Sequence, residues 1–121
     1  MNRLKTCASV LAAGLLTISL PAMAHHSFAM FDQTKTTDRK GVTVVQFQWA
    51  NPHVYVVVKS GTETFALECN SPSNMKQAGW KFNTLKAGDK IDISYFPLRN
   101  GKPGGALKVA TLGGGKKLDA W

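Results

Sequence analysis

The stretch GVTVVQFQWANPHVYVVVK, residues 41–59, carries the strongest fold signal in this 121-residue chain. Hydrophobic and polar side chains alternate in its first half, with Val45, Phe47 and Trp49 on one face and Gln46 and Gln48 on the other. This alternation, in a segment rich in β-branched and aromatic residues, predicts a strand over residues 41–49. Pro52 cannot donate a ladder hydrogen bond, so it marks a turn. Residues 53–59 then predict a second strand.

The next segments extend the pattern. Residues 62–69 predict a third strand that places Phe65, Leu67 and Cys69 on one face. A short helix of about two turns follows. Ser71 suits its N-cap, Pro72 its first position and Gly79 its C′ position.

Two further strands complete the prediction, over residues 90–96 and 106–112. Three strands, a short helix and two strands are the element order of an OB-like barrel. We therefore predict a mainly β fold, a small five-stranded OB-like barrel with one helix between the third and fourth strands. A β-sandwich fragment or a small open sheet is the alternative. Residues 113–121 are expected to form a flexible or weakly paired tail, and the polar segment 32–40 a loose arm.

The first 24 residues have the pattern of a secretory signal peptide. Arg3 and Lys5 precede an uncharged apolar run, and Ala22 and Ala24 form an A-x-A cleavage site. The run is shorter than the ~20 residues that span a bilayer, so a membrane anchor is the weaker interpretation. Cleavage after Ala24 leaves an N-terminal arm, residues 25–40, and one OB-like domain, residues 41–121, with no transmembrane segment. Export predicts a periplasmic location in a Gram-negative bacterium.

The chain is basic, with fifteen Lys and Arg against seven Asp and Glu. Two of the basic residues lie in the leader, so the mature chain has a formal charge of +6. Export and the scattered positions of the lysines argue against a nucleic-acid partner. Cys69 is the one cysteine of the mature chain, which excludes an internal disulfide and favours a buried apolar role.

Several short motifs together resemble a known family. They are AHHSFAMFD (24–32), the NPHV that follows Trp49, the paired SP (71–72) and GW (79–80), and LKAGDKI (85–91). In combination they look like a family of small exported proteins of Gram-negative bacteria without an established function. The resemblance covers nearly all of the mature chain. It implies export and a single small β-rich domain, and it carries over no activity and no site residues.

The three histidines give the clearest chemical hypothesis. Cleavage after Ala24 leaves His25 with a free α-amine, which can chelate a metal together with its imidazole. His53 can supply a third nitrogen, and His26 is a further candidate ligand. A nitrogen-rich, T-shaped site of this kind, a histidine brace, favours Cu(II). We therefore predict an exported copper-binding protein. Cleavage after Ala22 would instead make His25 the third residue of the mature chain. A histidine there can bind Cu(II) or Ni(II) together with backbone amides, in a different geometry.

A softer Cu(I) site is a weaker hypothesis. Met30, Met75 and Cys69 are possible sulfur ligands, and Trp49 can cap a cation with its ring. The plain structural interpretation assigns Trp49, Trp80, Met75 and Cys69 to the core, His53 to a hydrogen bond with a backbone carbonyl at the start of its strand, and His25 and His26 to a loose polar terminus.

Enzyme function is not predicted, because the sequence contains no recognisable catalytic motif. The alternative to a copper protein is an OB-like binding module for a periplasmic protein or a small apolar partner. Strand aromatics such as Trp49 and Tyr55 would line its binding face.

Overall fold

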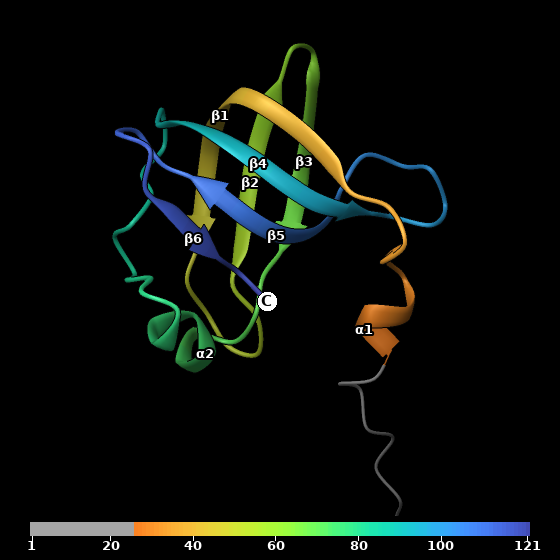
Figure 1. Ribbon diagram of the computed structural model, residues 1–121, viewed down its shortest axis with the longest axis horizontal. Coiled ribbons are helices and arrows are strands. Elements are labelled where there is room, and N and C mark those ends of the chain that lie inside the picture. The colour runs from red at the N-terminus through yellow and green to blue at the C-terminus, as the bar shows by residue number, and fades with distance from the viewer. Residues whose placement is uncertain (1–25) are drawn as a thin grey trace, which may run out of the picture.

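The computed structural model describes residues 26–121, with side chains from Phe28 onward (Figure 1). Its elements are α1 (His26–Ala29), β1 (Thr37–Gln48), β2 (Tyr55–Ser60), β3 (Glu63–Glu68), α2 (Pro72–Gln77), β4 (Lys90–Pro97), β5 (Gly105–Thr111) and β6 (Lys117–Asp119). The strand order is β3-β2-β1-β4-β5-β6, with antiparallel neighbours throughout.

The sheet closes on itself. β3 and β5 pair in parallel, with Leu67 opposite Gly105 and Glu68 opposite Ala106, which joins the first five strands into a barrel. The one short helix within the barrel sequence lies between β3 and β4. The predicted OB-like barrel is therefore confirmed, and the sandwich and open-sheet alternatives are wrong.

The core fills the barrel with alternate side chains from each strand. Val56 and Val58 of β2, like Leu67 of β3, are fully buried. Trp80 closes the end of the barrel that lies beside α2, and its indole Nε1 donates a hydrogen bond to the Asp119 carbonyl at 2.7 Å. Burial of this apolar surface supplies the main driving force for folding.

Helix α2 forms as its sequence predicts. The Ser71 hydroxyl accepts a hydrogen bond from the Asn74 amide at 3.3 Å, and Pro72 occupies the first turn. Gly79 has a φ of +96°, the left-handed conformation expected after the C-cap. Met75 points into the core and is fully buried, as the plain structural interpretation of this residue expected.

Strand β1 differs from its prediction at two points. It begins at Thr37, which pairs with Tyr95 of β4, so the last part of segment 32–40 is strand rather than loose arm. A bulge between Val44 and Gln46 also shifts the register against β2. One extra residue reverses the inward and outward positions. Val45 is consequently 46% exposed, and its predicted place beside Phe47 on one face is wrong.

The segment before β1 is docked on the connection between β4 and β5. The Asp32 amide donates to the Pro97 carbonyl at 2.8 Å, and the Arg99 amide donates to the Met30 carbonyl at 2.9 Å. Phe31, which bridges to Leu98, is buried. This docking fixes the direction from which the chain enters the barrel.

The C-terminal segment contains a short sixth strand, so of the two expectations for it, a flexible or a weakly paired tail, the flexible one is wrong. β6 pairs with the second half of β5. Beyond it, the Ala120 amide donates to the Lys108 carbonyl at 2.9 Å, while its own carbonyl accepts from the Asn70 amide at 3.0 Å. Ala120 thus connects β5 to the end of β3. Figure 1 shows the C-terminus at the same end of the barrel as α2 and the β1–β2 connection.

Candidate functional site

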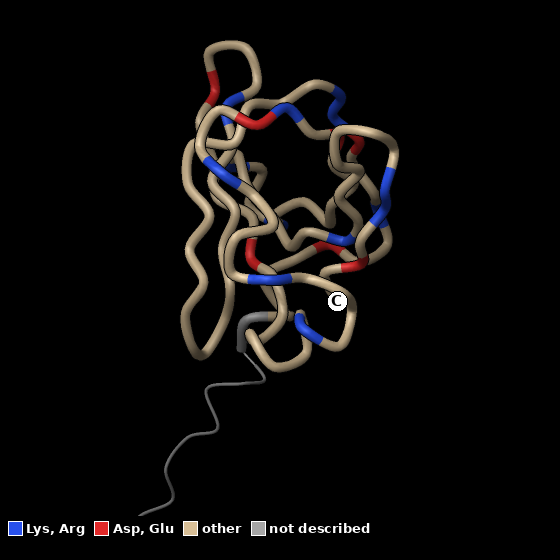
Figure 2. Tube along the Cα trace, turned by 90° about the vertical axis from the view of Figure 1, so that its left-hand side faces the viewer, with Lys and Arg blue, Asp and Glu red and all other residues tan. Residues whose placement is uncertain are grey.

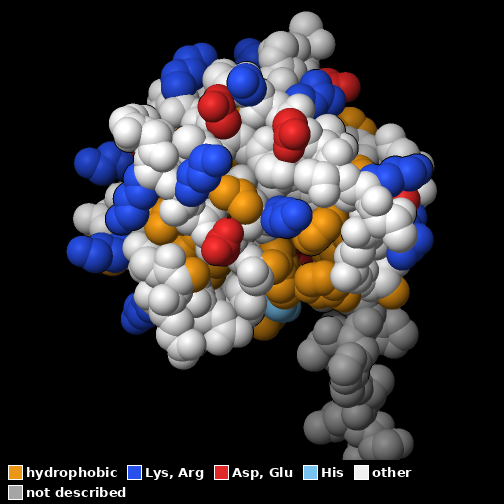
Figure 3. Space-filling model, in the orientation of Figure 1, with side chains coloured by type: hydrophobic (Ala, Val, Ile, Leu, Met, Phe, Trp, Pro, Cys, Tyr) orange, Lys and Arg blue, Asp and Glu red, His pale blue; other side chains and the backbone are white. Residues whose placement is uncertain are grey.

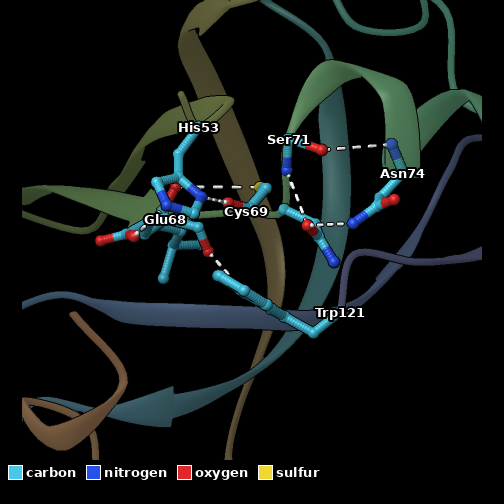
Figure 4. A network of polar contacts seen from close by, with 8 residues as sticks. His53, Glu68, Cys69, Ser71, Asn74 and Trp121 are labelled. Carbon is cyan, nitrogen blue, oxygen red and sulfur yellow. Dashed lines mark hydrogen bonds and ion pairs between the residues drawn. The ribbon is translucent and has the colours of Figure 1, made fainter. Parts of the chain in front are cut away.

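His53 lies in the connection between β1 and β2, next to the C-terminal end of β3 (Figure 4). Its Nδ1 is 3.1 Å from the Cys69 carbonyl oxygen. A carbonyl oxygen only accepts hydrogen bonds, so Nδ1 carries the hydrogen and donates it. In a neutral ring, this contact therefore places the hydrogen on Nδ1 and leaves the lone pair of Nε2 available. The imidazole is 23% exposed, so solvent reaches it.

Nε2 of His53 faces the carboxylate of Glu68, the last residue of β3. The Nε2–Oε1 distance is 3.7 Å, too long for a hydrogen bond. The Glu68 side chain is only 11% exposed, and its Oε1 has no hydrogen-bond partner among residues 28–121. A buried carboxylate oxygen without a partner is costly, so this atom needs either a cation or a protonated neighbour.

Aromatic rings surround the pair. The Trp121 ring lies 5.7 Å from the His53 ring, and its Nε1 donates to the Glu68 carbonyl at 3.1 Å. Tyr55 is opposite Glu68 in the β2–β3 ladder. Burial raises the pKa of the Tyr55 hydroxyl, and the Glu68 charge adds to the effect. Tyr55 therefore stays a neutral phenol near pH 7.

The N-terminal segment reaches this site through Phe28. The Phe28 ring packs edge-on against Trp121 with ring centroids 4.5 Å apart. Trp121 therefore lies between α1 and His53. His25 and the side chain of His26 are outside the described part of the chain, so their predicted role as ligands stays a prediction. The backbone of His26 begins α1, two positions before Phe28.

The weaker candidate ligands lie elsewhere. Trp49 is half-buried and packs against Phe47, with ring centroids 5.7 Å apart. Met30 is 54% exposed beside Arg99, whose backbone amide donates to the Met30 carbonyl. The Cys69 thiol is buried against the Leu67 carbonyl, and burial raises its pKa. The core positions expected for Cys69 and Trp80 are confirmed, and Trp49 lies at the margin of the core.

Among residues 28–121, no group of three or more His, Cys, Asp or Glu side chains is arranged to hold a metal ion. The described part of the site contributes two donors, His53 Nε2 and Glu68 Oε1. The sequence hypothesis missed both Glu68 and Trp121 as neighbours of His53. Strand alternation does place Glu68 on the outer face beside Tyr55, but no local pattern predicts the return of Trp121 to β3.

A groove lies across β1, β4, β5 and β6 on the described surface. It has a volume of about 530 Å³ and is lined by acidic side chains such as Asp38 and Asp92 and basic ones such as Arg39 and Lys117. The aromatic residues Trp49 and Tyr55, expected to line a binding face, do not contribute to it.

The surface is basic without a continuous basic patch on the face shown in Figure 3, where acidic side chains lie between the blue ones. Figure 2 shows the charged residues spread along many segments of the trace. Within residues 26–121, no helix combines the length and the apolar character needed to cross a bilayer.

Comparison with known proteins gives a family without an activity. No curated protein and no solved structure matches the chain. The match to a family covers residues 12–108, which is most of the sequence and includes β1 to β4 and the first half of β5. The chain therefore belongs to DUF6152, a family of unknown function.

Proposed function

We propose that the protein is exported to the periplasm of a Gram-negative bacterium and binds one copper ion between its mature N-terminus and His53. The observation that supports this proposal most directly is the orientation of His53. Its Nδ1 is anchored by the Cys69 carbonyl, and its Nε2 is directed away from the backbone toward Glu68. Metal-binding histidines commonly have one nitrogen held this way by a backbone carbonyl or carboxylate.

The docking of the N-terminal segment supports the same proposal. Phe28 contacts Trp121, and Trp121 contacts His53, so a single aromatic ring links α1 to the imidazole. A mature chain that begins at His25 would add an α-amine and up to two imidazoles from the residues just before Phe28. Three nitrogen donors in a T shape suit Cu(II).

The test is a Cu(II) titration followed by electron paramagnetic resonance (EPR) spectroscopy. The protein is exported and cleaved by the cell, and its intact mass confirms that it begins at His25. We expect one equivalent of Cu(II) with hyperfine coupling from about three nitrogens. His53→Ala and His25→Ala should each bind Cu(II) more weakly and lose the three-nitrogen hyperfine pattern.

A matched control carries three additional glycines before His25. They keep every side chain, move the α-amine away from the imidazole and leave no histidine in the third position, so this protein should bind Cu(II) more weakly. Equal affinity in this protein, in His53→Ala and in the unmodified protein would contradict the proposal.

The groove across β1, β4, β5 and β6 favours a second candidate function, a binding module for a periplasmic partner. Its mixed charges suit a polar partner rather than the small apolar one expected from the sequence. Arg39→Glu and Lys117→Glu substitutions would weaken capture of such a partner from periplasmic extract. Copper binding would be unaffected.

A further inference from the structure

The carboxylate of Glu68 has no role in the site as proposed above, although it is buried next to His53. We propose that Glu68 Oε1 is a direct ligand of the same ion, which makes the site selective for a divalent cation over Cu(I). This inference rests on the proposed function. Its carrying observation is a carboxylate oxygen that faces an imidazole nitrogen without a hydrogen bond to any residue from 28 to 121.

The geometry fits two ligands of one ion. Donor atoms that each lie about 2 Å from a metal are separated by about 3–4 Å, depending on the angle between them. The 3.7 Å between His53 Nε2 and Glu68 Oε1 falls in this range, whereas a direct hydrogen bond would bring the two atoms closer. The His53 ring is 23% exposed, so an ion can approach from the side of the imidazole, while Glu68 Oε1 is itself buried behind it.

The His53 ring and the backbone of Glu68 are also held in place by their surroundings. The Cys69 carbonyl holds the imidazole, and the carbonyl of Glu68 accepts the indole hydrogen bond of Trp121. Glu68 also lies in the ladder that closes the barrel, opposite Tyr55 on one side and Ala106 on the other. Rigid support of this kind is what a preorganised metal site requires.

Charge determines the selectivity. A neutral imidazole and one carboxylate provide a single negative charge in a largely buried position, which a divalent ion compensates more fully than a monovalent one. Oxygen and imidazole donors also favour Cu(II), while Cu(I) favours sulfur. The Cys69 thiol is directed at the Leu67 carbonyl, and Met75 is enclosed in the core, so neither sulfur joins this pair.

The competing explanation is an ion pair between a protonated His53 and Glu68, with no role for metal. The two explanations differ in what Glu68→Gln does to the metal-free protein. Loss of an ion pair lowers the Tm, because it removes a favourable contact from a protonated imidazole. Loss of an uncompensated buried charge leaves the Tm unchanged or raises it, because the neutral amide is less costly to bury.

The experiment compares the unmodified mature protein with Glu68→Gln and with Glu63→Gln as the matched control. Glu63 belongs to the same strand, but its carboxylate is exposed and pairs with Arg39. Cu(II) affinity and EPR parameters are measured by titration, and Cu(I) affinity by competition with a Cu(I)-specific chelator. Thermal unfolding of the metal-free proteins supplies the third readout.

We expect Glu68→Gln to weaken Cu(II) binding about tenfold or more and to change the EPR parameters, with a smaller loss of Cu(I) affinity. Glu63→Gln should match the unmodified protein in both affinities. The Tm of metal-free Glu68→Gln should not fall.

The outcomes separate the two proposals. Stoichiometric Cu(II) binding that is identical in Glu68→Gln overturns the ligand role of Glu68 and leaves the proposed function intact. An equal loss of Cu(I) and Cu(II) affinity overturns the selectivity. A lower Tm of the metal-free Glu68→Gln protein with unchanged Cu(II) binding identifies the ion pair instead. Absence of stoichiometric binding by the unmodified protein overturns the proposed function and this inference together.

Discussion

Cys69 shows how strongly the barrel interior changes the chemistry of one residue. Its thiol is fully buried in the hydrophobic core and donates a hydrogen bond to the Leu67 carbonyl at 3.9 Å. Burial, followed by the nearby Glu68 charge, raises the pKa of this thiol. The folded protein therefore keeps the thiol proton at a pH where the unfolded chain has released it.

This raised pKa predicts a loss of stability in alkali. The buried thiol makes its full contribution to the free energy of unfolding below the ordinary thiol pKa of about 8.5. This contribution is lost as the pH rises above that value, because only the unfolded state releases the proton. The expected slope is about 1.4 kcal/mol per pH unit. Urea unfolding of metal-free protein between pH 7 and 10 measures it. Cys69→Ala should show a flatter decline, and an equal slope in both proteins would refute this account.

Where hydrophobic and polar residues alternate regularly, the sequence predicts which face of a strand each residue occupies. It does not predict the contacts between His53 and its neighbours. Phe65, Leu67 and Cys69 lie inside as expected, because the strand pleat alone decides their face. The 3.7 Å approach of Glu68 to His53 depends on how the β1–β2 connection folds beside β3. No local pattern encodes that distance.

At the scale of elements, one glycine allows β5 to approach β4 at the point where β5 also closes the barrel against β3. Gly105 begins β5, where it pairs with Pro97 of β4 and Leu67 of β3. A Cβ atom at Gly105 would overlap the carbonyl oxygen of Phe96. β4 and β5 can therefore approach this closely only because position 105 has no side chain.

Gly105→Ala should accordingly destabilise the protein by about 3 kcal/mol or prevent folding. Gly113→Ala is the matched control, because a Cβ there meets nothing within 4 Å. It should change stability by less than about 0.5 kcal/mol. Circular dichroism and urea unfolding compare the two variants. A Gly105→Ala protein as stable as Gly113→Ala would disprove the role of Gly105 in closure.

The packing of Phe28 on Trp121 attaches the N-terminal segment to the C-terminal one. Phe28→Ala should free this segment and speed tryptic cleavage after Lys35, whose side chain is 73% exposed. Phe82→Ala is the control, since Phe82 is 71% exposed. Its cleavage rate should equal that of the unmodified protein. The rate is followed by mass spectrometry, and equal rates in both variants would show that Phe28 does not hold the segment.

Elements with local signals were predicted well, and those formed by distant contacts were not. β2, β3, β4 and α2 follow from alternation and from the cap residues Ser71 and Gly79. The early start of β1 depends on pairing with β4, far away in the sequence. β6 pairs with the preceding strand β5, but its three residues are too few to show alternation. Polar segments such as TDRK become strands when a neighbouring strand satisfies their backbone groups.

At the scale of the whole molecule, the barrel brings both ends of the described chain to one place. Phe28, Trp121, His53 and the end of β3 meet at one end of the barrel. The order of elements was sufficient to predict the barrel, because few topologies fit three strands, a helix and two strands. The meeting of the ends was not predictable, since it depends on β6 continuing the sheet past β5.

This arrangement predicts how copper should change stability. An N-terminal His25 chelate made of amine and imidazole forms in the unfolded chain as well, so it stabilises neither state selectively. Only donors that the fold brings to it, His53 and Glu68, add affinity in the folded state. If they tighten Cu(II) binding a hundredfold, saturating Cu(II) should raise the free energy of unfolding by about 2.7 kcal/mol.

Urea unfolding with and without saturating Cu(II) measures this difference. His53→Ala should remove most of the stabilisation while still binding Cu(II) weakly at its N-terminus, because the chelate there is independent of the fold. Glu68→Gln should lose the part that the carboxylate supplies. A copper effect of equal size in the unmodified protein and in His53→Ala would place the ion at the terminus alone. The barrel would then have no part in binding the metal.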